Sequence, residues 1–389
     1  MKPAFLSPTA FNASVILPLL PVFLLGAAIL TGGKEAMTTE ITRRDQTAKL
    51  AAVTAAPKGL PYGPYTVIRV PDILLSDRAR SKDVPVTVTA PDLDAAGPFP
   101  VILFSHGVGS DGTQNESLLR WWASHGYVVI SPTHSDSLRW QQRRQDLCDR
   151  SGSGIEEGDI GLQGIIRLAT HDPQAGAQRA RDVSFVLDSL CDLEKRVPAL
   201  EGRIDHARIG AAGTALGAYT AELISGATVS VPGTSGAISF RDPRARAVLQ
   251  LSGMGSGQQG LTKSSWNTVR LPIMTMTGSE DRGPGEMGPE GKRESFDLSP
   301  ATGNKYHVFI TGAHRGSFGG RFAGHRRRQQ PATTNQQTDQ KAIFCYIEQT
   351  SLAFWDMTLK NDAAAKTLLD QNPGALSRQR GVTATVEHK

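Results

Sequence analysis

The sequence is poor in cysteine, in aromatic residues and in long runs of one charge. Its 389 residues include 3 cysteines, and no group of Cys and His has the spacing of a metal site. Phe, Trp and Tyr make up 6%, and no stretch interleaves them with basic residues as nucleic-acid-binding segments do. The net charge of +5 is not gathered in a long Lys/Arg tract. We therefore expect no metal and no nucleic-acid partner.

The longest hydrophobic run is confined to the amino terminus. Lys2 precedes an apolar stretch at 15–30, which contains two prolines, is short for a membrane span and is followed by small residues. This pattern predicts that residues 1–36 are a cleaved export signal, with a retained membrane anchor as the alternative. Residues 37–60 are polar and have no strong period, which indicates a linker. The protein is then periplasmic or extracellular, and it contacts a membrane only if the first segment is retained.

If the protein is exported, its three cysteines allow one disulfide. Cys148 and Cys191 are the nearest pair in sequence, although spacing alone does not test the geometry of a bridge. Cys345 is then expected to be a buried thiol.

Buried strands and helical segments alternate from residue 61 to residue 371. Continuous apolar runs such as F-P-V-I-L-F-S, Y-V-V-I-S-P and L-P-I-M-T-M-T are typical of strands that are covered on both faces. Between them lie helical patterns, for instance at 177–193, where Val183 and Val186 share a face with two leucines. This order predicts an α/β domain with a mostly parallel sheet and helices on both faces. Residues 372–389 are expected to be a flexible tail.

The segment R-I-G-A-A-G-T-A-L-G-A-Y has the outline of a nucleophile elbow without its nucleophile. In the pattern G-x-S-x-G a serine would stand at 215, but the chain has Ala215 between Gly213 and Gly217. A tight strand-to-helix turn needs both glycines, and it directs the central side chain into the cleft. The amide of Leu216 would then lie at a helix N-terminus, where it can face a developing oxyanion. A plain Gly/Ala-rich helix start is the alternative.

The segment L-F-S-H-G-V-G-S-D-G supplies a second turn after a buried strand. The amide of Val108 is the expected second oxyanion donor. Residues 107–112 also form a literal G-x-G-x-x-G, and Asp136 follows the next strand, so a dinucleotide-binding oxidoreductase is the alternative function. Against it, two strands precede this unit, whereas a dinucleotide fold usually opens with it.

Two further strand ends carry an acid and a histidine. Asp281, with Glu280 as second choice, follows L-P-I-M-T-M-T-G-S, and His314 follows K-Y-H-V-F-I-T-G-A. A carboxylate in the first place would orient a histidine base in the second. The order elbow, acid, histidine is that of the α/β-hydrolases.

With these residues the chain from about Tyr62 to Asp362 resembles the dienelactone-hydrolase-like and platelet-activating-factor-acetylhydrolase-like branch of that superfamily. The segments P-V-I-L-F-S-H-G-V-G-S, R-A-R-D-V-S-F-V-L-D-S-L, R-I-G-A-A-G-T-A-L-G-A-Y-T-A and G-A-H-R-G-S-F-G-G carry the resemblance. It implies carboxylic-ester or lactone hydrolysis by a Ser-His-Asp triad, with no metal or cofactor. Matching positions give Ala215 for the nucleophile, Asp281 for the acid, and Val108 and Leu216 for the oxyanion amides.

The chain departs from the family pattern at two of these positions. Alanine has no lone pair with which to attack a carbonyl. The family histidine stands three residues before the phenylalanine of an H-x-x-F turn, and counting back from Phe318 gives Arg315, one residue after His314. Arginine is permanently protonated and cannot serve as a base. Thr214, Ser105 and Ser110 are weaker candidates for a replacement nucleophile.

Three functions remain open. The chain is a natural pseudo-hydrolase that binds an ester-like or acidic small molecule, a Ser-to-Ala variant of an active esterase, or the oxidoreductase named above. Two substituted positions favour the first, because an engineered change would normally alter only one. A cationic rim formed by Arg282, Arg315, Arg321 and Arg326 to Arg328 suggests a ligand with a carboxylate or phosphate.

Overall fold

The computed structural model describes residues 62–92, 95–151, 171–283, 287–319, 334–371 and 382–389, and the single residues 164, 169 and 285. The expected export signal at 1–36 and linker at 37–60 lie outside these residues. Within them, no helix combines the length and the apolar character that a membrane span requires.

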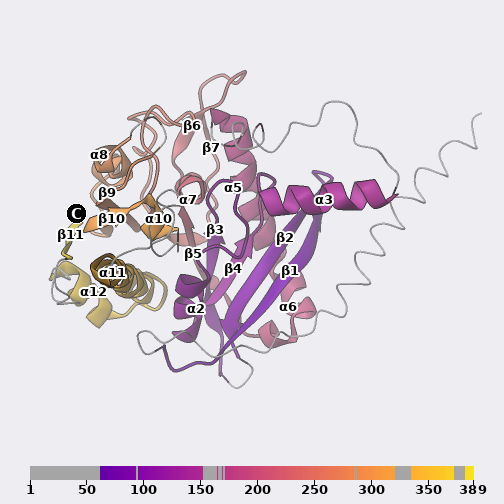
Figure 1. Ribbon diagram of the computed structural model, residues 1–389, viewed down its shortest axis with the longest axis horizontal. Coiled ribbons are helices and arrows are strands. Elements are labelled where there is room, and N and C mark those ends of the chain that lie inside the picture. The colour runs from indigo at the N-terminus through magenta and orange to yellow at the C-terminus, as the bar shows by residue number, and fades with distance from the viewer. Residues whose placement is uncertain are drawn as a thin grey trace, which may run out of the picture. The chain divides into compact units, whose positions relative to one another are not determined.

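The centre of the molecule is a nine-stranded sheet with the order β1-β2-β4-β3-β5-β8-β9-β10-β11 (Figure 1). The block from β4 to β10 is parallel, and β1, β2 and β11 join it through antiparallel pairings. This confirms the predicted fold class. The strands are β1 (Val67–Asp77), β2 (Lys82–Pro91), β3 (Phe99–Ser105), β4 (Val128–Pro132), β5 (Ile204–Thr214), β8 (Ala245–Leu251), β9 (Ile273–Glu280), β10 (Lys305–His314) and β11 (Ala384–His388); β6 (Thr228–Ser230) and β7 (Ala237–Ser239) pair separately.

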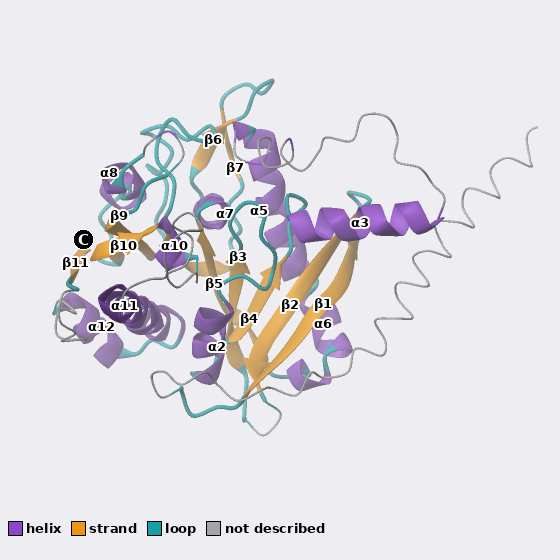
Figure 2. Cartoon of the chain, in the orientation of Figure 1, coloured by secondary structure: helices purple, strands orange, loops and turns teal. Residues whose placement is uncertain are grey.

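Helices cover both faces of the sheet (Figure 2). One hydrophobic cluster joins α5 and α7 to the sheet, and a second joins α2, α11 and α12 to its other face. The helices are α2 (Glu116–Ser124), α3 (Leu138–Ser151), α5 (Pro173–Asp188), α6 (Leu190–Arg196), α7 (Leu216–Ser225), α8 (Pro289–Lys292), α9 (Glu294–Leu298), α10 (Arg315–Phe318), α11 (Thr334–Leu359) and α12 (Ala363–Asp370), with a 3-10 turn at Pro198–Leu200.

Local sequence sets the start of α5 and its buried face. Asp172 accepts a hydrogen bond from the amide of Gln174 and so caps the helix, and Pro173 occupies its first position. Val183 and Val186 are buried as expected. The predicted helix at 177–193 is two helices, because the chain leaves helical geometry at Ser189 before α6 begins.

The carboxyl-terminal segment corrects one expectation. Part of the stretch expected to be a flexible tail is β11, which pairs antiparallel with β10 and closes one edge of the sheet. Val382, Ala384 and Val386 alternate with more exposed residues, so every second side chain is buried.

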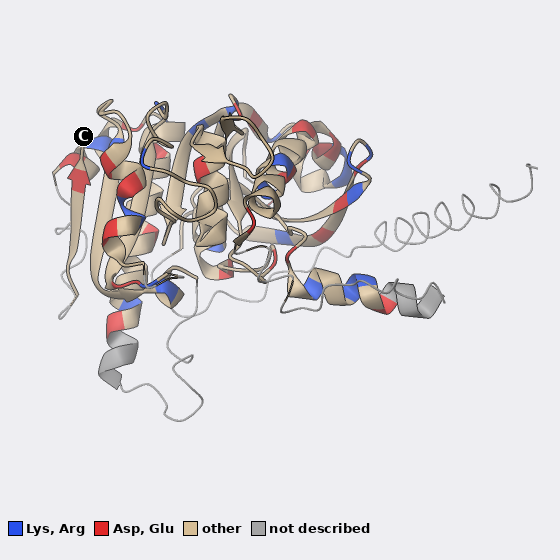
Figure 3. Ribbon diagram, turned by 90° about the horizontal axis from the view of Figure 1, so that it is seen from above, with Lys and Arg blue, Asp and Glu red and all other residues tan. Residues whose placement is uncertain are grey.

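Acidic and basic positions are interspersed over the helices (Figure 3), so charge of one sign does not dominate the faces seen there.

Candidate active site

The turn from β5 to α7 has the geometry of an elbow. Ala215 has φ 53° and ψ −113°, a conformation that residues with a Cβ rarely adopt. A methyl group on Gly213 would overlap the carbonyl of Gly217, and one on Gly217 would overlap the carbonyl of Ser105. The two glycines therefore allow α7 to pack closely against β5 and β3. A plain helix start would not require this strained residue between them.

Two backbone amides are available near Ala215. Leu216 is the first residue of α7, where a helix leaves its first amides without intrahelical partners. Val108 lies in the turn after β3, and the Gln114 side chain fixes that turn by accepting a hydrogen bond from the amide of Gly107 at 2.7 Å. Among the described residues, none accepts a hydrogen bond from the amide of Val108 or Leu216. Both amides can thus bind an oxygen atom of a ligand.

The predicted acid, Asp281, is fully buried, and its hydrogen-bond donors are a lysine, a serine and a threonine. Its Oδ1 accepts hydrogen bonds from Lys292 Nζ at 2.7 Å and from Ser252 Oγ at 2.9 Å, and its Oδ2 accepts one from Thr277 Oγ1 at 2.9 Å. Lys292 is itself 1% exposed. Burial lowers the pKa of its amine, and the Asp281 carboxylate opposes that shift. Lys292 was not identified from the sequence, since it ends the short helix α8, which follows no strand directly.

The predicted base, His314, is engaged in its own turn. It is the N-cap of α10: its Nδ1 accepts a hydrogen bond from the amide of Gly316 at 3.0 Å, and its amide donates to Ser317 Oγ at 3.2 Å. No hydrogen bond or ion pair joins His314 to Asp281 in the described structure. The acid and the histidine are therefore not brought together as a catalytic pair.

Arg315 stands three residues before Phe318, where the family pattern has its histidine. Its guanidinium interacts electrostatically with the carboxylate of Asp281. Burial lowers the pKa of its guanidinium, and the carboxylate of Asp281 opposes this. Its positive charge also lowers the pKa of Lys292. Two cations, Lys292 and Arg315, thus act on the Asp281 carboxylate. Over the part of the chain that the structure describes, no acceptor is hydrogen-bonded to the Arg315 guanidinium.

The first part of the chain matches a known family. Residues 62–150 match the model of the chlorophyllase family, which belongs to the α/β-hydrolase superfamily. This match and the parallel sheet agree. The chain has the α/β-hydrolase fold. The match includes the turn of Val108 but ends before the elbow, and the narrower dienelactone-hydrolase-like branch stays a prediction. No curated protein sequence matches the chain.

A buried Ser-His-Asp arrangement lies at the carboxyl ends of β3 and β4, against α5. Ser105 Oγ is 3.1 Å from His134 Nε2, and His134 Nδ1 is 3.0 Å from Asp182 Oδ2. The three residues are 2%, 0% and 0% exposed, so a substrate has no access to the serine. Lys82 and Arg80 also bind Asp182. This arrangement stabilises the packing of α5 against the sheet, and Ser105 is not a replacement nucleophile. Thr214 is likewise buried.

Arg179 holds the oxyanion turn from the same side. It binds the Asp136 carboxylate through Nε and Nη2, at 2.9 and 2.7 Å, and donates from Nη1 to the His106 carbonyl. Asp136 in turn accepts a hydrogen bond from the amide of Gly109. Burial alone would raise the pKa of Asp136, but Arg179 keeps it well below its usual range. Because its carboxylate is bound in this way, Asp136 is not free for the ribose of a dinucleotide.

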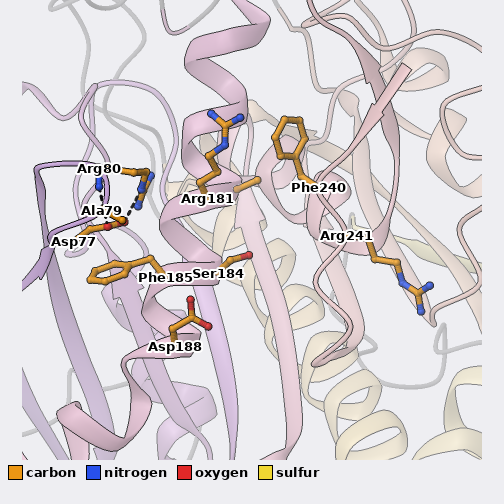
Figure 4. A pocket seen from close by; sticks show the side chains of 10 residues that line it. Asp77, Ala79, Arg80, Arg181, Ser184, Phe185, Asp188, Phe240 and Arg241 are labelled. Carbon is orange, nitrogen blue, oxygen red and sulfur yellow. Dashed lines mark hydrogen bonds and ion pairs between the residues drawn. The ribbon is translucent and has the colours of Figure 1, made fainter. Parts of the chain in front are cut away.

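The groove in Figure 4 is separate from the elbow. It has a volume of about 660 Å³ and lies along α5, between Phe185 and Phe240. None of the elbow, acid or histidine positions lines it. Arg321 and Arg326 to Arg328 of the expected cationic rim lie outside the described residues. Cys191 is a free thiol, which corrects the suggested disulfide; the Cys148 side chain lies outside the described residues.

Proposed function

We propose that this protein binds a small carboxylate- or ester-bearing molecule at the elbow and does not hydrolyse it. The observation that carries the proposal is the pairing of Asp281 with Lys292. In a working triad the acid orients a histidine, and the histidine activates the nucleophile. Here an ammonium group takes that place beside Asp281, and the elbow residue is Ala215.

The site lacks both side chains that ester hydrolysis would need, a nucleophile and a general base. Ala215 has no side-chain oxygen with which to form an acyl intermediate. The guanidinium of Arg315 is permanently protonated, so it cannot act as a general base. The oxyanion amides alone retain about 10³ to 10⁴-fold acceleration over water in enzymes that have lost their triads. That residual is too small for ordinary esterase turnover, which exceeds the uncatalysed rate by a factor of about 10⁶ or more.

The groups that remain at the site all favour negative charge. The amide of Leu216 lies at the positive end of the α7 dipole, and the amide of Val108 has no acceptor among the described residues. Arg315 presents a planar guanidinium that can bind a carboxylate through two hydrogen bonds. Since Lys292 already neutralises Asp281, the Arg315 charge is left in excess. A carboxylate, or an ester carbonyl beside a carboxylate or phosphate, is the ligand class that these groups fit.

Hydrolysis of p-nitrophenyl acetate and butyrate tests the lack of turnover. The chain is compared with Ala215→Ser and with Ala215→Ser combined with Arg315→His. We expect the chain and the single variant to remain near the background rate, because no base reaches position 215. Strong activity of Ala215→Ser would contradict the proposal and would indicate an active esterase that has lost only its serine, with His314 as its base.

Binding is tested independently by thermal shift and calorimetry with short-chain carboxylates and phenyl phosphate. Arg315→Met is expected to weaken binding by about tenfold or more, since a charge-assisted hydrogen bond contributes about 1.5–3 kcal/mol. Arg270→Met is the matched control, because Arg270 is an exposed arginine that precedes β9, at the opposite end of that strand from Asp281. Equal effects of the two substitutions would show that the ligand senses only the overall charge.

A further inference from the structure

A cluster of metal-ligand side chains lies near the amino end of β5, away from the elbow at its carboxyl end. It consists of Cys191 and Glu194 from α6 and His206 from β5. One ligand atom from each residue (the thiol sulfur, a carboxylate oxygen and a ring nitrogen) lies within 4.8 Å of the other two. His206 Nε2 and Glu194 Oε2 are already 3.0 Å apart. The cluster has no part in the function proposed above.

The sequence of α6 places two of these residues on its outer face. Cys191 and Glu194 are three positions apart, so they are neighbours on one side of the helix. Leu190 and Leu193 are 2% and 0% exposed and fix the adjacent side of the helix against the core. Cys191 is exposed and Glu194 is half-buried. The helix therefore holds the thiol and the carboxylate together at the surface.

A bulge in β5 brings the third residue to them. Pro100 of β3 pairs with Asp205, but the next residue, Val101, pairs with Ile209, so 206–208 are extra residues on β5. The Asp205 side chain stabilises this bulge by accepting hydrogen bonds from the Ala207 amide and from Arg208. Bulges commonly redirect a side chain out of the regular alternation of a strand. Here the bulge presents His206 to Glu194.

We propose that Cys191, Glu194 and His206 form a zinc site. Thiolate, imidazole and carboxylate are the three side-chain types that bind Zn²⁺, at about 2.0–2.3 Å, and a site with three protein ligands leaves the fourth tetrahedral position to water. Ligand atoms around such an ion are about 3.5 Å apart, so exposed side chains now within 4.8 Å need only small rotations. A thiolate and an imidazole disfavour Mg²⁺ and Ca²⁺, which prefer oxygen.

The bound ion would connect α6 to the bulge of β5. Its ligands come from two segments that the turn at Pro198–Leu200 joins, and Cys191, the cysteine of these segments, is a free thiol. Because an ion that binds only the folded state raises the stability of that state, zinc should raise the melting temperature of the chain. The three side chains that bind zinc lie on other elements than the amides of Val108 and Leu216. Zinc binding should therefore leave the proposed small-molecule site unchanged.

Calorimetric titration of the metal-free, tag-free full chain with ZnCl₂ under reducing conditions tests the proposal. We expect one equivalent to bind and the melting temperature to rise. Cys191→Ser and His206→Gln should each weaken binding by about tenfold or more. Asp192→Asn, on the same helix, and Cys345→Ser, at a buried thiol, are the matched controls and should bind zinc as the unaltered chain does.

Cobalt(II) gives a readout that does not depend on stability. It should produce a thiolate-to-cobalt charge-transfer band that disappears in Cys191→Ser and persists in Cys345→Ser. The proposal is overturned if the chain shows no saturable zinc binding, if Cys191→Ser binds zinc as tightly as the unaltered chain, or if the site takes copper(II) but not zinc.

Discussion

The elbow and the surroundings of Asp281 differ in what packing fixes. On the elbow side, Gly213, Ala215 and Gly217 keep the tight turn and the strained backbone conformation. On the acid side, Asp281 keeps its position after β9, but its partner is Lys292. Backbone geometry on the first side is enforced by close packing against β3. Side-chain chemistry on the second is not enforced by packing, and a different cation can satisfy the same carboxylate.

The largest effect is expected on the acid side. Lys292→Met removes the cation from a fully buried carboxylate, and breaking a buried ion pair in this way costs about 3–5 kcal/mol of unfolding free energy. Adding Asp281→Asn should recover part of that loss, because no unpaired charge then remains. Urea denaturation of the two single variants and the double variant measures this. If Lys292→Met cost less than about 1 kcal/mol, the pair would not be the structural replacement that we describe.

An effect of comparable size, spread over several pH units, is expected from a buried acid on the elbow side, which forms no ion pair among the described residues. Glu222 of α7 is fully buried, and burial raises its pKa from 4.5 to about 8. The folded state therefore holds a proton that the unfolded state releases, and the free energy of unfolding should fall as the pH rises from about 4.5 to about 8. The slope for one proton is about 1.4 kcal/mol per pH unit.

Glu222→Gln should remove this part of the pH dependence while keeping the size of the side chain. The measurement is urea denaturation at several pH values between 5 and 8, for the chain and the variant. Glu348, whose pKa burial also raises to about 8, contributes to both proteins and cancels in the difference. Parallel pH curves would show that Glu222 is not protonated in the folded state.

The smallest effect is expected at the elbow residue itself. Ala215 has a positive φ, which costs a residue with a Cβ about 1–3 kcal/mol, whereas glycine adopts that conformation freely. Ala215→Gly should therefore stabilise the chain by about 1 kcal/mol, after the entropy cost of glycine in the unfolded state. The control, Ala212→Gly in the regular part of β5, should destabilise it. A loss of stability at both positions would mean that Ala215 is not strained, and thermal unfolding decides this.

Sequence patterns predicted the sheet better than they predicted its edges. The apolar runs of β3, β4, β8 and β9 are buried on both faces, so their hydrophobicity alone revealed them. The strand β11 was missed because an edge strand alternates over few residues and gains its order from β10. The break at Ser189 was also missed, since hydrophobic periodicity continues from α5 into α6.

The sequence by itself determined the elbow, because a glycine on each side of position 215 is required by contacts within one short strand-to-helix unit. It also showed directly that the elbow position holds alanine and that Arg315 stands one residue after His314. The tertiary structure decided which side chains bind Asp281 and that His314 caps its own helix. It alone brought Cys191 and Glu194 to His206. These contacts join separate elements, and the side-chain directions that create them depend on packing and on a strand bulge that no local pattern encodes.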